Sequence, residues 1–96
     1  MVRYLSLLRF TDRGVTAIKD SPARARQFVK SAKDAGVEVE AQYWTIGSCD
    51  GFLVLRADSE EKVLRCLGHL AATGNVRTES LKALDATEFQ GLLKDG

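Results

Sequence analysis

The chain has 96 residues, 45% of them hydrophobic and 28% charged, a composition ordinary for one small globular domain spanning residues 1–96. Lys and Arg number 14 and Asp and Glu 13, so the net charge of +1 lacks the basic footprint of a dedicated nucleic-acid-binding protein. No apolar stretch approaches membrane-spanning length. We therefore expect a cytoplasmic protein with neither a nucleic-acid nor a membrane partner.

The few cysteine and histidine residues restrict the metal and redox chemistry that the sequence predicts. Cys49 and Cys66 fall in different predicted elements and form no Cys-x-x-Cys pair, and His69 is the lone histidine. A structural zinc site needs a cluster of such ligands. We expect no metal, no cofactor and two reduced thiols.

The chain begins with a predicted strand, followed by a loop and a helix. Residues 2–10 are apolar at even and odd positions alike, which is typical of a strand buried on both faces. Residues 11–20 are interpreted as a loop, and Ser21-Pro22 as a helix N-cap followed by proline at the first helical position. The helix is expected to end at Gly36. Apolar residues recur at helical spacing within it: Ala25, Phe28, Val29 and Ala32.

Two strands joined by a hairpin follow the helix. Val37, Val39 and Ala41 alternate with polar residues, which predicts an edge strand with one face in water. A turn over residues 47–51 leads into residues 52–57, again apolar at even and odd positions.

A second helix, a fourth strand and a short C-terminal helix complete the chain. Asp58 and Glu61 resemble a capping box, and Gly74 ends the helix that they open. Residues 76–84 predict the fourth strand, and Asp85 with Glu88 repeats the capping pattern. The buried stripe of the second helix is expected to contain Val63, Leu64, Leu67, Leu70 and Ala71.

This order of elements predicts an α+β fold, the ferredoxin-like βαββαβ sandwich. Right-handed crossovers produce a four-stranded antiparallel sheet with two helices on one face, plus the short C-terminal helix. The expected spatial order of the strands is four, one, three, two. The other sheet face lacks a helical cover, although strands one and three are apolar on both sides. We expect that face to bind a second copy of the chain, making a homo-oligomer.

The predicted strand order brings three distant segments to one edge of the sheet. They are the end of strand one, the hairpin and the start of strand four. Glycines there permit close backbone approach, and an arginine offers a planar, multiply donating group to a carboxylate or phosphate. The candidate ligand-binding residues are Thr11, Gly14, Asp50, Asn75 and Arg77.

Each of the two charged candidates has a structural alternative. Asp50 could contact a ligand, but shaping the turn through side-chain-to-backbone hydrogen bonds is the favoured role. Arg77 could bind an anion or form a surface ion pair with Glu79 two residues along the strand. Catalysis by Cys49 is disfavoured because the adjacent Asp50 works against a thiolate.

The sequence resembles the GYD domain family over nearly its whole length. Gly47 and Asp50 match the family's Gly-x-Tyr-Asp motif, whereas Cys49 occupies the tyrosine position. The resemblance implies a ferredoxin-like, dimeric α/β-barrel type of protein without a defined reaction. It is carried by Phe10-Thr11-Asp12-Arg13-Gly14, Lys19-Asp20-Ser21-Pro22, Thr45-Ile46-Gly47-Ser48-Cys49-Asp50 and Gly74-Asn75-Val76-Arg77-Thr78-Glu79.

Three hypotheses about function are compatible with these patterns. The favoured one is a small-molecule binding module with its site at the convergent edge. The alternatives are a cofactor-independent enzyme of the dimeric α/β-barrel type and a structural assembly protein whose open sheet face is only an interface. Whether the protein is an enzyme is left undecided by the sequence.

Overall fold

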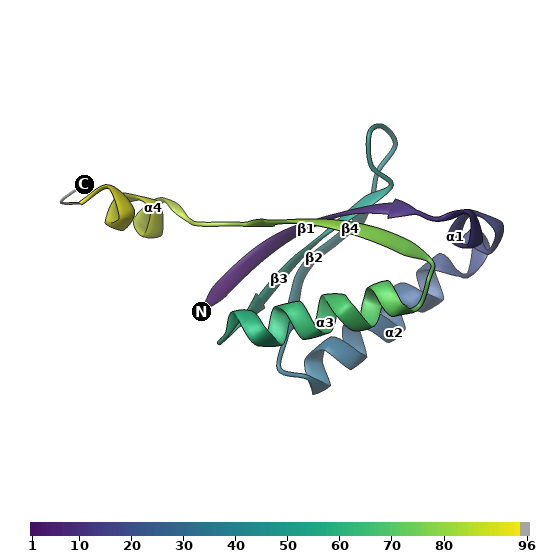
Figure 1. The fold of residues 1–96 in the computed structure, drawn as a ribbon, viewed down its shortest axis with the longest axis horizontal. Coiled ribbons are helices and arrows are strands. Elements are labelled where there is room, and N and C mark those ends of the chain that lie inside the picture. Colours follow the sequence, from purple (N-terminus) through teal and green to yellow (C-terminus); the bar gives the residue numbers. More distant parts are fainter. Residues whose placement is uncertain (95–96) are drawn as a thin grey trace.

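The computed structural model describes residues 1–94, and α2 and α3 pack against one face of a four-stranded antiparallel sheet (Figure 1). The strand order is β2-β3-β1-β4. This confirms the predicted α+β ferredoxin-like arrangement. The elements are β1 (Val2–Phe10), α1 (Asp12–Thr16), the 3₁₀ turn η1 (Ile18–Asp20), α2 (Ser21–Asp34), β2 (Glu38–Trp44), β3 (Gly51–Ala57), α3 (Glu60–Ala72), β4 (Val76–Lys82) and α4 (Ala86–Leu93).

The register of β1 and β3 assigns their side chains to two faces. Ser6 pairs with Leu53 on the helix-covered face, whereas Leu5 pairs with Val54 on the open face. Buried Ser6 shares a hydrogen bond of 2.7 Å with the hydroxyl of Ser80. The buried core lies between the helices and the sheet and contains Ala32, Val37, Leu53, Leu55, Ala57, Val63, Cys66 and Leu67.

A β-bulge interrupts the alternation expected in β2. The register shifts between Val39, opposite Leu55, and Ala41, opposite Val54, so these two residues lie on different faces. The prediction of one continuous apolar face was wrong here because a bulge adds an unpaired residue and changes which way the strand's side chains point. The extra residue, Glu40, accepts a hydrogen bond of 2.6 Å from Arg3, which lowers the pKa of its carboxyl.

The segment between β1 and α2 is helical, not a loop. Thr11 caps α1, its Oγ1 accepting from the Gly14 backbone N–H. The backbone is already helical at Asp20, the last residue of η1. Ser21 therefore lies inside α2 and does not act as its N-cap. Its hydroxyl instead accepts a hydrogen bond of 3.0 Å from Trp44 Nε1.

The start of α3 is displaced by one residue from the prediction. Ser59, in extended conformation, accepts from the Lys62 N–H and is the N-cap, whereas Asp58 pairs with the Lys62 ammonium. Leu64 is 58% exposed and Ala71 is also exposed, so the prediction was wrong for both, whereas Cys66 is buried beside Val63 and Leu67. The predicted capping box of Asp85 and Glu88 is confirmed. None of the helices within residues 1–94 has the length and apolarity needed to cross a membrane.

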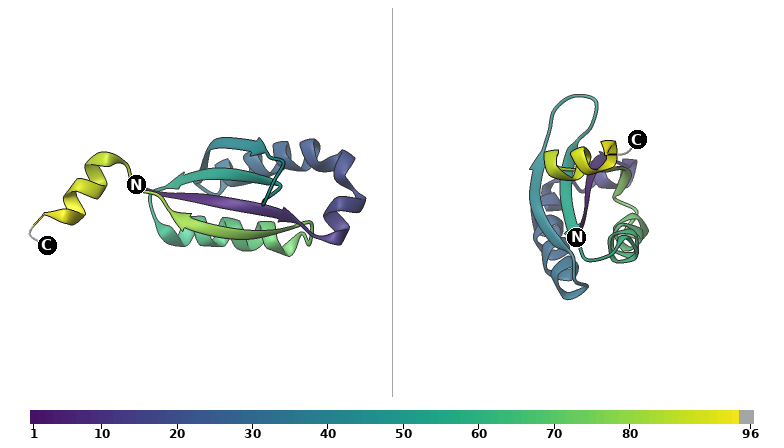
Figure 2. Two further views of the ribbon diagram at one scale, coloured as in Figure 1. Left: turned by 90° about the horizontal axis from the view of Figure 1, so that it is seen from above. Right: turned by 90° about the vertical axis from the view of Figure 1, so that its left-hand side faces the viewer.

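The C-terminal helix α4 does not cover the sheet. It projects beyond the end of β4 as an arm, away from α2 and α3 (Figures 1 and 2). At the opposite end of the sheet, the hairpin between β2 and β3 rises above the open face (Figure 1). Both projections carry exposed apolar side chains: Ile46 on the hairpin, and Phe89, Leu92 and Leu93 on α4.

Candidate functional site

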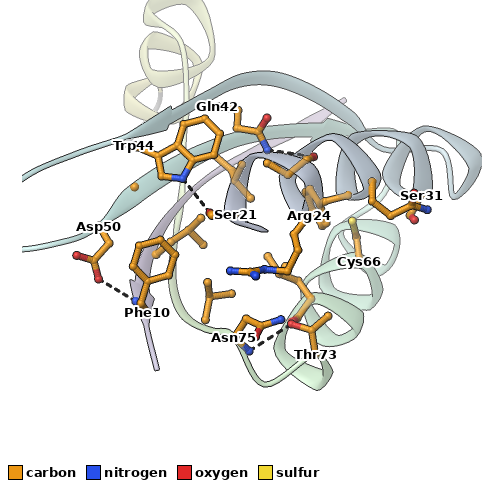
Figure 3. Close-up of a pocket in the computed structure, with 18 of the residues that line it drawn as sticks. Phe10, Ser21, Arg24, Ser31, Gln42, Trp44, Asp50, Cys66, Thr73 and Asn75 are labelled. Carbon is orange, nitrogen blue, oxygen red and sulfur yellow. Dashed lines mark hydrogen bonds between the residues drawn. The ribbon is translucent and has the colours of Figure 1, made fainter. Parts of the chain in front are cut away.

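A cleft of about 300 Å³ lies on the helix-covered side of the sheet (Figure 3). Its lining comes from α2, α3, the ends of β1 and β2, and the starts of β3 and β4. This volume is at the lower limit of sites that bind small molecules. Its principal apolar side chains are Leu8, Phe10, Phe28, Leu53, Leu70 and Val76.

Three of the predicted site residues form a latch between β1 and β4. The Thr11 backbone N–H donates to the Asn75 carbonyl at 3.1 Å, and the Thr11 hydroxyl donates to the Gly74 carbonyl at 2.6 Å. Gly14 packs against the same strand start, where a Cβ would lie 2.0 Å from the Asn75 carbonyl oxygen. Thr11, Gly14 and Asn75 thus meet as the strand order predicted, and Asn75 also lines the cleft.

Asp50 joins the hairpin to β1. Its Oδ2 accepts from the Phe10 backbone N–H at 2.8 Å, and its own N–H donates to the Leu8 carbonyl at 2.8 Å. The side chain therefore fixes the hairpin against the end of β1 through a side-chain-to-backbone bond. Asp50 also lines the cleft at its hairpin end.

Arg77 lies on the opposite face of the sheet from the cleft. It pairs with Arg9 across β1 and β4, whereas its neighbour Val76 pairs with Phe10 and lines the cleft. Adjacent residues of a strand point to opposite faces, which separates Arg77 from the other four candidates. Among residues 1–94, no salt bridge joins Arg77 to Glu79.

The cleft contains an arginine that was not among the residues predicted from the sequence. Arg24 of α2 extends its guanidinium into the middle of the cleft (Figure 3). Its Nη1 donates to the Ala17 carbonyl at 2.9 Å, while Nη2 is buried without a hydrogen-bond partner. The sequence held one signal: Arg24 precedes Phe28 by four residues, which places both on one side of the helix.

The two cysteines differ in accessibility, and both are free thiols. Burial raises the pKa of the Cys66 thiol, whereas Cys49 is half-exposed in the hairpin, where its carbonyl accepts from the Thr45 hydroxyl at 2.7 Å. Within residues 1–94, no group of three or more His, Cys, Asp or Glu side chains is arranged to hold a metal ion.

We expect the thiol reagent DTNB to modify the two cysteines in separate phases at pH 8. Cys49 should react first, and Cys66 at least about tenfold more slowly, because both burial and a raised pKa lower its thiolate reactivity. The Cys49→Ser variant should lose the fast phase only, and unfolding in guanidinium chloride should merge the two phases. Equal rates in the folded protein would contradict the assigned burial of Cys66.

Comparison with known proteins adds a family and a relative to this geometry. No solved structure matches the chain. The chain is 32% identical over 95 residues to the "Glutamine synthetase and cystathionine beta-lyase binding protein" of Thermus thermophilus, covering 98% of this chain and 100% of that protein. Residues 4–93 match the family model of the GYD domain. The chain therefore belongs to the GYD domain family.

Proposed function

We propose that this protein is a protein-binding module that works as a homodimer. The observation that carries the homodimer is an apolar sheet face without a helical cover. The name of the Thermus relative supports a binding role, and we extend it to this chain: the dimer binds glutamine synthetase, cystathionine β-lyase or both. We also propose that it acts in the cytoplasm, where its two free thiols stay reduced.

The open sheet face is rich in apolar side chains. The rings of Tyr43 and Phe52 stack with centroids 5.4 Å apart, and Tyr43 remains 61% exposed. Exposed apolar patches of this kind mark interaction surfaces. We call this surface the open sheet face. By the strand register, its apolar residues are Leu5, Leu7, Ala41, Tyr43, Phe52, Val54 and Leu81.

Charged residues lie at both ends of the open sheet face. One end of the face has Arg9 and Arg77, and neither forms a salt bridge within residues 1–94. The other end has Glu38 and Glu40 together with Arg3 and Arg56, and Glu40 already pairs with Arg3. A twofold axis in the plane of the sheet and perpendicular to the strands places Arg9 and Arg77 of one copy over the end of the other copy that carries Glu38.

The same symmetry brings together the two exposed projections. The hairpin and α4 lie at opposite ends of the sheet (Figure 1). In the twofold dimer, the hairpin of one copy meets the arm of the other, so Ile46, which is fully exposed in the monomer, contacts the apolar side of α4. Such reciprocal contacts are what an isologous interface requires.

Binding to the two enzymes is tested with purified proteins. Biolayer interferometry with the organism's own glutamine synthetase and cystathionine β-lyase should show saturable binding of the dimer to at least one, and serum albumin should show none. An enzyme-binding surface distinct from the dimer interface should leave the dimer intact in the complex, as checked by light scattering. Absence of saturable binding to both enzymes at 50 µM would refute the partner assignment.

Small-molecule binding is a second candidate function, and the cleft between α2 and α3 is the observation that favours it. Asp50 and Asn75 of the predicted site line this cleft, while Thr11 and Gly14 hold its edge in place. Arg77, on the other face, belongs to the proposed dimer interface. The enzyme alternative has no comparable support, because none of these contacts forms a nucleophile–base pair.

A further inference from the structure

Arg24 is the one polar group of the cleft whose hydrogen-bonding capacity is left unused in the interior. Among the described residues, its Nη2 is the only buried side-chain nitrogen or oxygen without a hydrogen-bond partner. Buried polar atoms are satisfied in the great majority of native proteins, so an exception needs an explanation. A ligand in the cleft that supplies an acceptor to Nη2 would provide that explanation.

The surroundings of Arg24 provide no such acceptor. No carboxylate of residues 1–94 forms a salt bridge with it. Asp50, which also lines the cleft, lies beyond Phe10 and is engaged by the Phe10 N–H (Figure 3). Trp44 and Gln42 donate to Ser21 and to a backbone carbonyl of α2, so they too are directed into the protein.

We infer that the cleft binds a small carboxylic acid with an apolar body, the carboxylate resting on Arg24. This inference rests on the small-molecule candidate function and names its ligand class. Guanidinium and carboxylate form strong, charge-assisted hydrogen bonds, and Arg24 Nη2 still has two N–H groups to donate. The remaining lining, with Phe10, Phe28 and Leu70, suits an aromatic or branched aliphatic body.

Charge within the cleft also sets the orientation of the ligand. The Asp50 carboxylate at the hairpin end repels the carboxylate of the ligand, while Arg24 attracts it. The acid therefore lies with its carboxylate toward the α2 side and its apolar body toward Phe10. Trp44, the only tryptophan of the chain, lines the same cleft and reports occupancy through its fluorescence.

The test is a titration of the purified protein with phenylacetate and with its neutral isostere phenylacetamide. Trp44 emission, excited at 295 nm, is followed to 50 mM ligand at constant ionic strength, and 4-methylpentanoate with its amide serves as an aliphatic pair. Each acid should bind saturably, and each amide at least about tenfold more weakly, because only the acid forms charge-assisted bonds. Arg24→Gln should abolish this preference, and the matched control Arg26→Gln, an exposed arginine on the same helix, should retain it.

The outcomes separate the ligand class from the candidate function. Acid and amide that bind equally would overturn the role of Arg24 yet leave small-molecule binding in place. Absence of saturable binding by all four compounds would overturn both. If Arg24→Gln fails to fold, the arginine Nε–H resonances of the wild type decide: phenylacetate should shift the Arg24 resonance and leave that of Arg26 unchanged, and the reverse would refute the assignment.

Discussion

Replacing Leu5 with aspartate is expected to convert the proposed dimer to a monomer. Leu5 lies on β1 in the middle of the open sheet face, between Val54 of β3 and Leu81 of β4. In the proposed dimer its carboxylate would be buried against apolar side chains of the second copy without a partner. Burying such a charge is costly, so we expect the dissociation constant to rise at least about a hundredfold.

Light scattering coupled to size exclusion measures this change. The wild type should have twice the 10.5 kDa mass of the chain, and Leu5→Asp should have the mass of one chain. Its circular dichroism should stay native, since Leu5 faces away from the core. The control is Leu64→Asp on α3, because Leu64 is 58% exposed on the other side of the molecule and the variant should remain dimeric.

Two results would contradict the interface. A wild-type mass of one chain at high micromolar concentration would show that the open sheet face does not dimerise. A dimeric Leu5→Asp variant would place the contact elsewhere. Leu8→Asp gives the opposite pattern, because Leu8 packs against the core on the helix-covered face and its replacement should unfold the monomer.

The Gly14→Ala variant is expected to lose about 3 kcal/mol of unfolding free energy. The added Cβ would lie 2.0 Å from the Asn75 carbonyl oxygen and 3.0 Å from its carbonyl carbon. Both atoms are backbone, and they cannot retreat without breaking the hydrogen bonds from Thr11 to Asn75 and Gly74. The latch between β1 and β4 is therefore lost along with the packing.

Urea unfolding at a fixed protein concentration measures the loss, because the proposed dimerisation would make stability concentration-dependent. The matched control is Gly68→Ala in α3, where an added Cβ meets nothing within 4 Å. Alanine should stabilise that helix by about 0.5–1 kcal/mol. A loss of less than about 1 kcal/mol for Gly14→Ala would show that the backbone at Asn75 moves to accommodate the added Cβ with little loss of stability.

Local patterns in the sequence were sufficient to predict the fold of this protein. Apolar residues at even and odd positions of β1 and β3 predicted two apolar faces, and the register confirms that Leu5 and Leu8 lie on opposite faces. The capping box of Asp85 and Glu88 acts within one helical turn, so the sequence alone predicts it. The family resemblance rested on short segments of the same kind and is confirmed.

Two of the errors involve contacts between distant residues. Ser21 was predicted to be an N-cap, but the helical conformation begins earlier, in η1, and the Ser21 hydroxyl accepts a hydrogen bond from Trp44 instead. The bulge in β2 depends on cross-strand pairing, so the alternation of Val37, Val39 and Ala41 gave no sign of it.

The candidate site divides in the same way between sequence and tertiary structure. The order of the strands, inferred from the sequence, was sufficient to bring Thr11, Gly14 and Asn75 together, with Asp50 on the adjoining hairpin. It did not distinguish the two faces of β4, where one residue of register puts Val76 in the cleft and Arg77 outside it. Nor could it find Arg24, because an arginine on a helix is normally solvated and only the packing of α2 and α3 over the sheet buries its Nη2.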